Sequence, residues 1–167
     1  TQSKAGTQLL VVTPSQELTA QVTQVIRECL QQLKLTLIVT PLGGGANVKR
    51  QQEKLKKHPE IVVGTPGRLL ELAKNKKLKL HQLRTVVFDE ADALLTEQTM
   101  NDCCELLGHA PSQLQLAFFS ATDGSVLHEL PHWFGQAVER FDVRQEDQTQ
   151  GKVAHWFLIS PTRKRYD

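Results

Sequence analysis

Three carboxylates near the middle of the sequence have the types and spacing that chemistry requires. Asp89 and Glu90 directly follow the apolar run Thr85–Phe88, and Asp92 comes two residues later. A carboxylate at the end of a buried strand can hold Mg²⁺ beside nucleotide phosphates, and a neighbouring carboxylate can orient an attacking water. The same residues could instead cap the next helix, because acidic side chains favour helix N-termini. Taken alone, these residues favour the two interpretations about equally.

Three further apolar runs also end in small, polar or charged residues. Leu9–Thr13 leads into the letters PSQEL, Ile61–Gly64 into TPGR, and Leu114–Phe119 into SAT. In open parallel sheets, ligands bind at the carboxyl ends of the strands. We therefore expect these residues and the acidic group to form one chemical edge of a sheet.

The elements that must position these residues alternate along the chain. The expected strands are Leu9–Thr13, Thr36–Thr40, Ile61–Gly64, Thr85–Asp89, Leu114–Ser120 and Glu139–Val143. Several are almost continuously apolar, which is typical of parallel strands covered on both faces. The expected helices are Ser15–Leu33, Asn47–Lys57, Arg68–Asn75, Asn101–Leu107 and Ser125–Phe134. This alternation predicts an α/β domain with a mostly parallel sheet. In the first helix, the predicted apolar face consists of Leu18, Val22, Val25, Ile26, Cys29, Leu30 and Leu33.

Length and composition exclude several classes of protein. A chain of 167 residues corresponds to about one domain, and 40% hydrophobic with 23% charged residues is typical of a soluble globular protein. No stretch approaches the ~18 apolar residues of a membrane span, and Thr1–Thr7 does not resemble a secretory signal. Three cysteines form no disulfide framework, so we expect a reducing, cytoplasmic location. A net charge of +2 excludes a strongly basic arm, so any nucleic-acid site must be built locally.

Five motifs occur in a distinctive order: PSQEL, the glycines Gly43–Gly45, TPGR, DEAD and SAT. In this order the sequence resembles the first core domain of the DEAD-box ATP-dependent RNA helicases, from Leu9 to about Ile159. The resemblance implies a RecA-like parallel sheet with helices on both faces. It also implies ATP and Mg²⁺ as cofactors. The implied partners are RNA, bound through its backbone without sequence specificity, and a second RecA-like domain of the same parent chain, with no membrane.

The resemblance gives each motif a role. Asp89 matches the family's Mg²⁺-associated aspartate, and Glu90 matches its water-positioning glutamate. Asp92, Ser120 and Thr122 match the polar network that couples the nucleotide site to strand separation. The residues that match the RNA-backbone motifs are Pro14, Ser15, Gln16, Glu17, Gly44, Gly45, Thr65, Pro66, Gly67 and Arg68. Glycine lets a backbone approach a phosphate closely, and helix N-termini bind anions, so these residue types suit that role.

Each RNA-backbone motif also has a purely structural interpretation. Thr-Pro-Gly-Arg alone is a good turn and helix start, and three glycines alone are more often a flexible turn than a phosphate site. Two departures from the family are also present. Gln16 stands where the family usually has arginine, so one contact lacks a charge. No G-x-x-x-x-G-K-[ST] loop occurs in the sequence, so a cradle for the ATP phosphates is missing.

These departures shape the expected organisation. Residues 1–144 are expected to be a partial first helicase core domain, 145–152 a linker, and 153–167 the start of the connection to a second helicase domain. The sheet is expected to lack its first strand. By resemblance that strand lies beside the one carrying Ser120, so this edge should be open.

The function expected from the resemblance belongs to an intact parent, an ATP-dependent RNA helicase that couples ATP hydrolysis to duplex unwinding or remodelling. The fragment alone should be inactive. Two alternatives remain: a non-catalytic RNA-binding or scaffold module without a P-loop, and a DNA-directed helicase of the same superfamily.

A zinc-protease pattern, H-E-x-x-H, also occurs at His128–His132. The motif needs both histidines on one uninterrupted helix. Pro131 lies inside it and is expected to break the helix or remove a backbone hydrogen bond. The sequence therefore argues against a zinc site here.

Overall fold

The computed structural model describes residues 6–45, 47–122, 124–135, 139–141 and 155–159. These residues form a seven-stranded sheet in the order β2-β3-β1-β4-β5-β7-β6, in which the first five strands are parallel and the last two are antiparallel to their neighbours. The strands are β1 Leu9–Val12, β2 Val39–Leu42, β3 Ile61–Gly64, β4 Thr85–Phe88, β5 Gln115–Ser120, β6 Glu139–Phe141 and β7 His155–Ile159. The prediction of an α/β domain with a mostly parallel sheet is confirmed.

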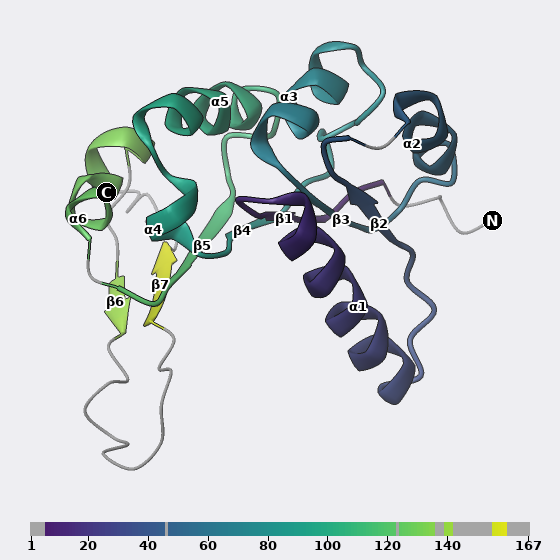
Figure 1. The fold of residues 1–167 in the computed structure, drawn as a ribbon, viewed down its shortest axis with the longest axis horizontal. Coiled ribbons are helices and arrows are strands. Elements are labelled where there is room, and N and C mark those ends of the chain that lie inside the picture. Colours follow the sequence, from purple (N-terminus) through teal and green to yellow (C-terminus); the bar gives the residue numbers. More distant parts are fainter. Residues whose placement is uncertain (1–5, 46, 123, 136–138, 142–154, 160–167) are drawn as a thin grey trace, which may run out of the picture.

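Helices cover both faces of the sheet, with α1 on one face and α3 and α5, which contact each other, on the other (Figure 1). The helices are α1 Gln16–Gln32, α2 Val48–Leu55, α3 Pro66–Lys74, α4 Ala91–Leu94, α5 Glu97–Leu107 and α6 Ser125–Phe134. The strand order changes direction at β1, because β2 and β3 lie to one side of it and β4 and β5 to the other. This order decides which of the strand-end motifs become neighbours.

The two-residue period of the strands divides the core between the two faces of the sheet. Leu10 and Val12 of β1 point into the larger hydrophobic cluster, which also contains residues of α3, α5 and α6. Val11 points to the opposite face, where Val22 and Ile26 of α1 pack against it. Alternate side chains of one strand are therefore buried on both faces, which explains why β1 is apolar throughout.

The predicted apolar face of α1 is only partly correct. Val22, Ile26 and Leu30 pack on the sheet as expected. Val25 and Leu33, however, are 57% and 67% exposed, and Cys29 is exposed as well. The most buried side chains of α1 are instead its threonines, Thr19 and Thr23. Both threonine hydroxyls donate to main-chain oxygens four residues earlier, so burial leaves no polar hydrogen without a partner.

At the carboxyl end of the chain, two expectations change. The expected open edge beside the strand carrying Ser120 is wrong for this structure, because β7 pairs with β5 there in antiparallel register. The strand predicted within 153–159 thus belongs to the same sheet. Residues 145–152, predicted as a linker, and the end of the strand predicted at Glu139–Val143 lie outside the described residues. The boundary between two helicase domains stays a prediction.

Two helices differ clearly from the sequence-based expectation. α5 begins at Glu97 rather than Asn101, because Thr96 caps it and exchanges hydrogen bonds with Thr99. The short helix α4 has no apolar period and was not predicted. α6 spans Ser125–Phe134 as predicted, so of the two effects expected of Pro131 the helix break does not occur and the loss of one backbone hydrogen bond remains.

Candidate functional site at the carboxyl edge of the sheet

The carboxyl ends of β2, β3, β1 and β4 lie at one level. The N–H of Thr13 donates to Gly64 O at 2.9 Å, and the N–H of Asp89 donates to Val12 O at 2.9 Å. The N–H of Thr65 reaches Leu42 O at 3.3 Å. The first residues after β1, β3 and β4 therefore continue the hydrogen-bonded ladder. This brings the motifs after β1, β3 and β4 onto one edge, as the sequence predicted. It also places the glycines there, because β2 ends at Leu42 rather than at the predicted Thr40.

Asp89 and Glu90 begin the acidic part of this edge. Asp89 is partly buried, and burial raises the pKa of its carboxyl group, although a hydrogen bond from the N–H of Glu90 partly opposes this. Glu90 adopts a left-handed backbone conformation, with φ of 48°, directly before α4, and it is exposed. A non-glycine residue in this conformation is uncommon and occurs often at functional sites. This conformation begins the turn that leads from β4 into α4.

Asp92 joins the end of β4 to the end of β5. The Thr122 hydroxyl donates to Asp92 Oδ2 at 2.6 Å, and the Ser120 hydroxyl donates to Thr122 O at 2.8 Å. Burial alone would raise the pKa of Asp92, but hydrogen bonds from Thr122 and from the Ala93 N–H outweigh it, so the pKa lies below its usual value. The contact between the DEAD and SAT motifs that the resemblance implied is therefore present in the structure.

An aromatic cluster lies directly behind the acidic group. Phe88 of β4 and Phe118 of β5 stack with ring centroids 4.7 Å apart and planes 6° apart. Phe134 of α6 packs against both rings at 5.6 and 5.3 Å. Phe88 immediately precedes Asp89, and Phe118 lies two residues before Ser120. Phe88 and Phe118 are register partners in the β4–β5 ladder, so the stack packs just before the two strand ends that carry the acidic and hydroxyl groups.

Three helices begin at the same edge, near the motifs predicted to contact RNA. Ser15 caps α1 by accepting a hydrogen bond from Leu18 N, and Asn47 caps α2. Thr65 precedes α3 without making a side-chain cap bond, and Pro66 occupies its first turn. Helix N-termini carry a partial positive charge and unpaired N–H groups, so this half of the edge suits an anionic ligand.

Gln16 lies against the glycine turn that follows β2. A Cβ atom placed on Gly43 would lie 2.9 Å from Gln16 Cγ, and one on Gly45 would lie 3.0 Å from Gln16 Oε1. Gly45 also has φ of +76°, which residues with side chains rarely adopt. A Cβ on Gly44, in contrast, would meet nothing within 4 Å. The structure therefore brings Gln16 and the glycines together, with conformation requiring Gly45 and close approach favouring Gly43.

A residue that the sequence analysis missed connects the glycine turn to the TPGR motif. Gln51 of α2 is only 4% exposed, and its Nε2–H donates to Gly43 O at 2.9 Å. Its Oε1 accepts from Arg68 Nη1 at 3.1 Å, and Arg68 Nε also pairs with Glu71 at 3.1 Å. The only available signal was its helical spacing, three residues after Val48 and four before Leu55. Arg68, predicted to contact RNA, is thus held between two protein partners.

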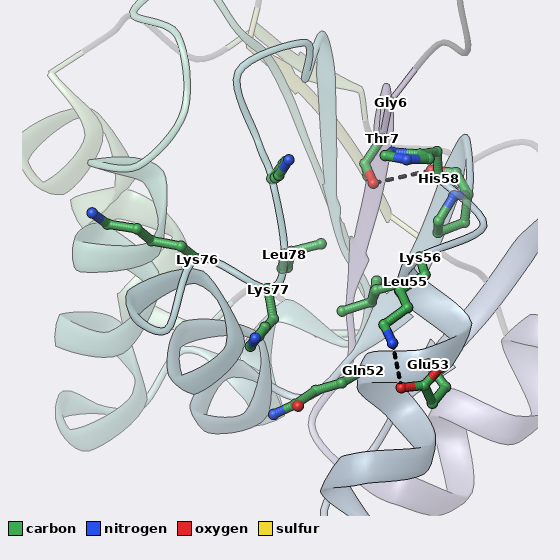
Figure 2. A pocket seen from close by; sticks show the side chains of 12 residues that line it. Gly6, Thr7, Gln52, Glu53, Leu55, Lys56, His58, Lys76, Lys77 and Leu78 are labelled. Atoms are coloured by element: carbon green, nitrogen blue, oxygen red, sulfur yellow. Dashed lines mark hydrogen bonds and ion pairs between the residues drawn. The ribbon is translucent and has the colours of Figure 1, made fainter.

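A cavity of about 400 Å³ lies at the opposite edge of the sheet, near Gly6 and Thr7 before β1 (Figure 2). It lies where α2 and α3 end, and several lysines line it, including Lys76 and Lys77. Cations favour helix C-termini, which accounts for lysines at this position. Lys56, also in the lining, is already paired with Glu53 at 2.6 Å. This cavity contains none of the predicted site residues.

Other candidate chemistry finds no support in the part of the chain that the structure describes. The described residues contain no group of three or more His, Cys, Asp or Glu that could hold a metal, so His128 and His132 make no zinc site although their helix is continuous. Burial raises the pKa of the Cys103 thiol to about 12, which leaves it unreactive. None of the described helices has the length and apolar character of a membrane span.

The parallel sheet, with its motifs gathered at the strand carboxyl ends, defines the RecA-like class of α/β domain. The model of one family, described as DEAD/DEAH box helicase, matches residues 1–130, so the chain belongs to that family.

Individual relatives agree with this assignment. The chain is 39% identical over 158 residues to the probable ATP-dependent RNA helicase YfmL of Bacillus subtilis, which covers 95% of this chain and 42% of that protein. It is 35% identical over 161 residues to the DEAD-box ATP-dependent RNA helicase CshC of Bacillus cereus, covering 96% of this chain and 40% of that protein. The chain therefore spans less than half the length of these relatives.

Solved structures show the same fold. A DEAD box protein from the hyperthermophile Methanococcus jannaschii has a TM-score of 0.64 and 29% identity, covering 76% of this chain and 34% of that one. A variant of Saccharomyces cerevisiae Dbp5 bound to RNA and ADP–BeF3 has a TM-score of 0.66 and 28% identity, covering 75% of this chain and 31% of that one.

Proposed function

We propose that this chain is the first core domain of an ATP-dependent RNA helicase, in which ATP hydrolysis is coupled to the unwinding or remodelling of short RNA duplexes. The observation that carries this proposal is the 2.6 Å hydrogen bond from Thr122 to Asp92, which ties the acidic strand end to the neighbouring one. The intact protein would close a second RecA-like domain onto this edge. Free cysteines agree with a reducing, cytoplasmic location.

In the nucleotide half of the edge, the proposal gives the acidic residues separate tasks. The carboxylate of Asp89 is a hard oxygen ligand of the kind Mg²⁺ prefers, so it would hold the ion that accompanies ATP. When bound there, Mg²⁺ supplies positive charge to the phosphate oxygens. Glu90, exposed on its turn, would accept a hydrogen bond from the attacking water and orient it. The phosphate cradle would come from a P-loop outside this sequence.

In the other half of the edge, the N-termini of α1 and α3 and the glycine turn would bind the RNA backbone. The residues proposed to line this path are Pro14, Ser15, Gln16, Glu17, Gly44, Gly45, Thr65, Pro66, Gly67 and Arg68. Contacts from helix N–H groups and an arginine reach phosphates, which carry no sequence information directly. Binding should therefore be largely independent of base sequence.

Coupling between the halves would run through the hydroxyl network. The Thr122–Asp92 bond lies at the surface of the edge, where a hydrogen bond contributes about 0.5–1.5 kcal/mol, enough to shift a two-state closure by about two- to tenfold. Ser120 and Thr122 are neutral and poorly suited to Mg²⁺ chemistry, so they would transmit the state of the acidic group rather than act on ATP.

The proposal is tested in the intact protein by Glu90→Gln. This variant should bind ATP and RNA but lose nearly all RNA-stimulated ATP hydrolysis, because the amide keeps the shape of the side chain and loses its charge and basicity. Glu97→Gln, an exposed change of the same kind in the first turn of α5, is the matched control and should retain activity. Equal activity of the two variants would refute the role of Glu90.

A second variant separates coupling from chemistry. Ser120→Ala combined with Thr122→Ala should keep much of the ATPase activity and lose much of the duplex unwound per ATP consumed. If that ratio is unchanged, the coupling role is wrong.

The alternative of a non-catalytic RNA-binding module has one observation in its favour, the absence of a P-loop from this sequence. Wild-type protein that binds RNA without hydrolysing ATP would favour it. Stimulation of ATP hydrolysis by DNA as strong as that by RNA would instead favour a DNA-directed helicase.

A further inference from the structure

A groove of about 630 Å³ lies between α1 and α2 at the β2 edge of the sheet. We call it the α1–α2 groove. The side chains that matter to the argument are Gln16, Gln24 and Arg27 from α1 and Asn47, Arg50 and Lys54 from α2. None of the residues assigned to ATP chemistry lines it.

All charged side chains that line this groove are positive. Three cationic side chains, Arg27, Arg50 and Lys54, line it, and neither aspartate nor glutamate does. Arg50 and Lys54 are four residues apart, so they lie on the same face of α2, about 6 Å apart along its axis. Arg27 is anchored by donating to Val39 O at 3.1 Å. Among the described residues, neither Arg50 nor Lys54 forms an ion pair, so their charges are not neutralised by the protein.

The groove is continuous with the proposed RNA path. Gln16 and Gly43 line it at the carboxyl edge of the sheet, where Gln16 packs against the glycine turn. Gln51, which hydrogen-bonds Gly43 O, also lines it. An RNA strand that leaves the edge at the glycine turn therefore meets the opening of a cationic groove.

We propose that the α1–α2 groove is an additional binding segment for the backbone of single-stranded RNA, in which Arg50 and Lys54 contact phosphates of nucleotides beyond those held at the strand ends. This inference rests on the proposed function. A polyanion fits the groove because its charge is entirely positive, and the contacts come from side chains that reach phosphates rather than bases. RNA long enough to enter the groove gains these contacts, whereas RNA confined to the strand ends does not.

The basic cavity at the opposite edge provides a matched control (Figure 2). Lys76 and Lys77 are exposed there, and they lie beyond the C-terminus of α3 rather than near the glycine turn. Replacing them by glutamine removes two charges, the same number as replacing Arg50 and Lys54. A non-specific effect of net charge on RNA affinity would be equal in the two double variants.

The experiment measures the affinity of the intact protein for oligouridylates of about 6 and about 20 nucleotides over a range of salt concentrations. Arg50→Gln with Lys54→Gln should remove most of the affinity advantage of the longer RNA and leave the shorter RNA bound as in the wild type, which also shows that the variant is folded. For the longer RNA, the slope of log affinity against log salt should fall by roughly 1.4, because single strands lose about 0.7 per phosphate contact. Lys76→Gln with Lys77→Gln should leave the length advantage unchanged.

Several results would overturn the proposal. These are an equal loss for both RNA lengths, an equal effect of the control variant, or no affinity advantage of the longer RNA in the wild type. Polyglutamate is tested as a competing ligand. If it binds the wild type more tightly than the longer RNA does, and the groove variant no longer binds it, the groove is a site for an acidic protein segment instead. If the wild type unwinds RNA and the groove variant binds both RNA lengths as the wild type does, the groove proposal is refuted and the proposed function stands. Wild-type protein that binds neither RNA refutes the proposed function as well.

Discussion

Replacing Gln51 by methionine tests whether a buried amide holds two motifs of the edge together. Methionine keeps the length of the side chain and removes both hydrogen bonds. The bond to Arg68 involves a charged group and contributes roughly 1.5–3 kcal/mol, and the bond to Gly43 O contributes about 0.5–1.5 kcal/mol. Because Gln51 is 4% exposed, water cannot readily replace these bonds. We expect the free energy of unfolding to fall by about 2–4 kcal/mol.

Urea denaturation of the chain measures this loss, and RNA affinity of the intact protein measures its functional consequence. Gln52→Met is the matched control, because Gln52 is the next residue of α2, is more exposed and makes no side-chain hydrogen bond within the described residues. It should change the free energy of unfolding by less than about 0.5 kcal/mol. A Gln51→Met variant as stable as Gln52→Met would refute the reasoning. Lost stability without weaker RNA binding would limit Gln51 to a structural role.

Three further predictions concern the same edge. Thr122→Val removes the hydroxyl that donates to Asp92, so the pKa of Asp92 should rise; NMR titration of the carboxyl carbon measures this, and an unchanged pKa contradicts it. In the wild type, the hydrogen bonds that lower the pKa of Asp92 stabilise the folded state at pH values above its usual pKa of 3.8. This stabilisation is lost as the pH falls through the lowered pKa. Phe118→Ala should cost about 3–5 kcal/mol of stability by urea denaturation, since the ring is fully buried and stacked, and a cost below about 1 kcal/mol would show that the stack is dispensable. Arg68→Ala should weaken RNA binding regardless of base sequence and lower the salt slope by roughly 1, whereas altered ATP affinity without RNA would place Arg68 in the nucleotide half.

Most of the strands and the chemical edge could be predicted from the sequence, because both depend on local patterns. A run such as Ile61–Gly64 is apolar at every position, which is typical of a strand buried on both faces. Polar residues directly after such runs must lie at the strand ends. The acidic and hydroxyl motifs were therefore predictable as members of one edge, although the contact between Asp92 and Thr122 came only from the family resemblance.

The prediction failed for the buried face of α1, because the sequence pattern fits more than one orientation of that helix. The apolar residues of α1 surround much of the helix, so their period could not show that Val25 and Leu33 face solvent while Thr19 and Thr23 face the sheet. The threonines can be buried because their hydroxyls bond to the helix backbone, which sequence hydropathy does not count. The helix predicted at Ser125–Phe134 is present despite Pro131, because packing through Leu127 and Leu130 tolerates one missing hydrogen bond.

By itself, the sequence determined which residues stand at strand ends, because hydrophobic runs and the polar residues that follow them are encoded by neighbours along the chain. Only the tertiary structure decided which of those ends are adjacent. The strand order places the motifs after β1, β2 and β3 on one half of the edge and those after β4 and β5 on the other. It also brings Gln51 between Gly43 and Arg68, partners 8 and 17 residues away from it in sequence. Such contacts depend on how helices cross the sheet, and no local pattern in the sequence records that.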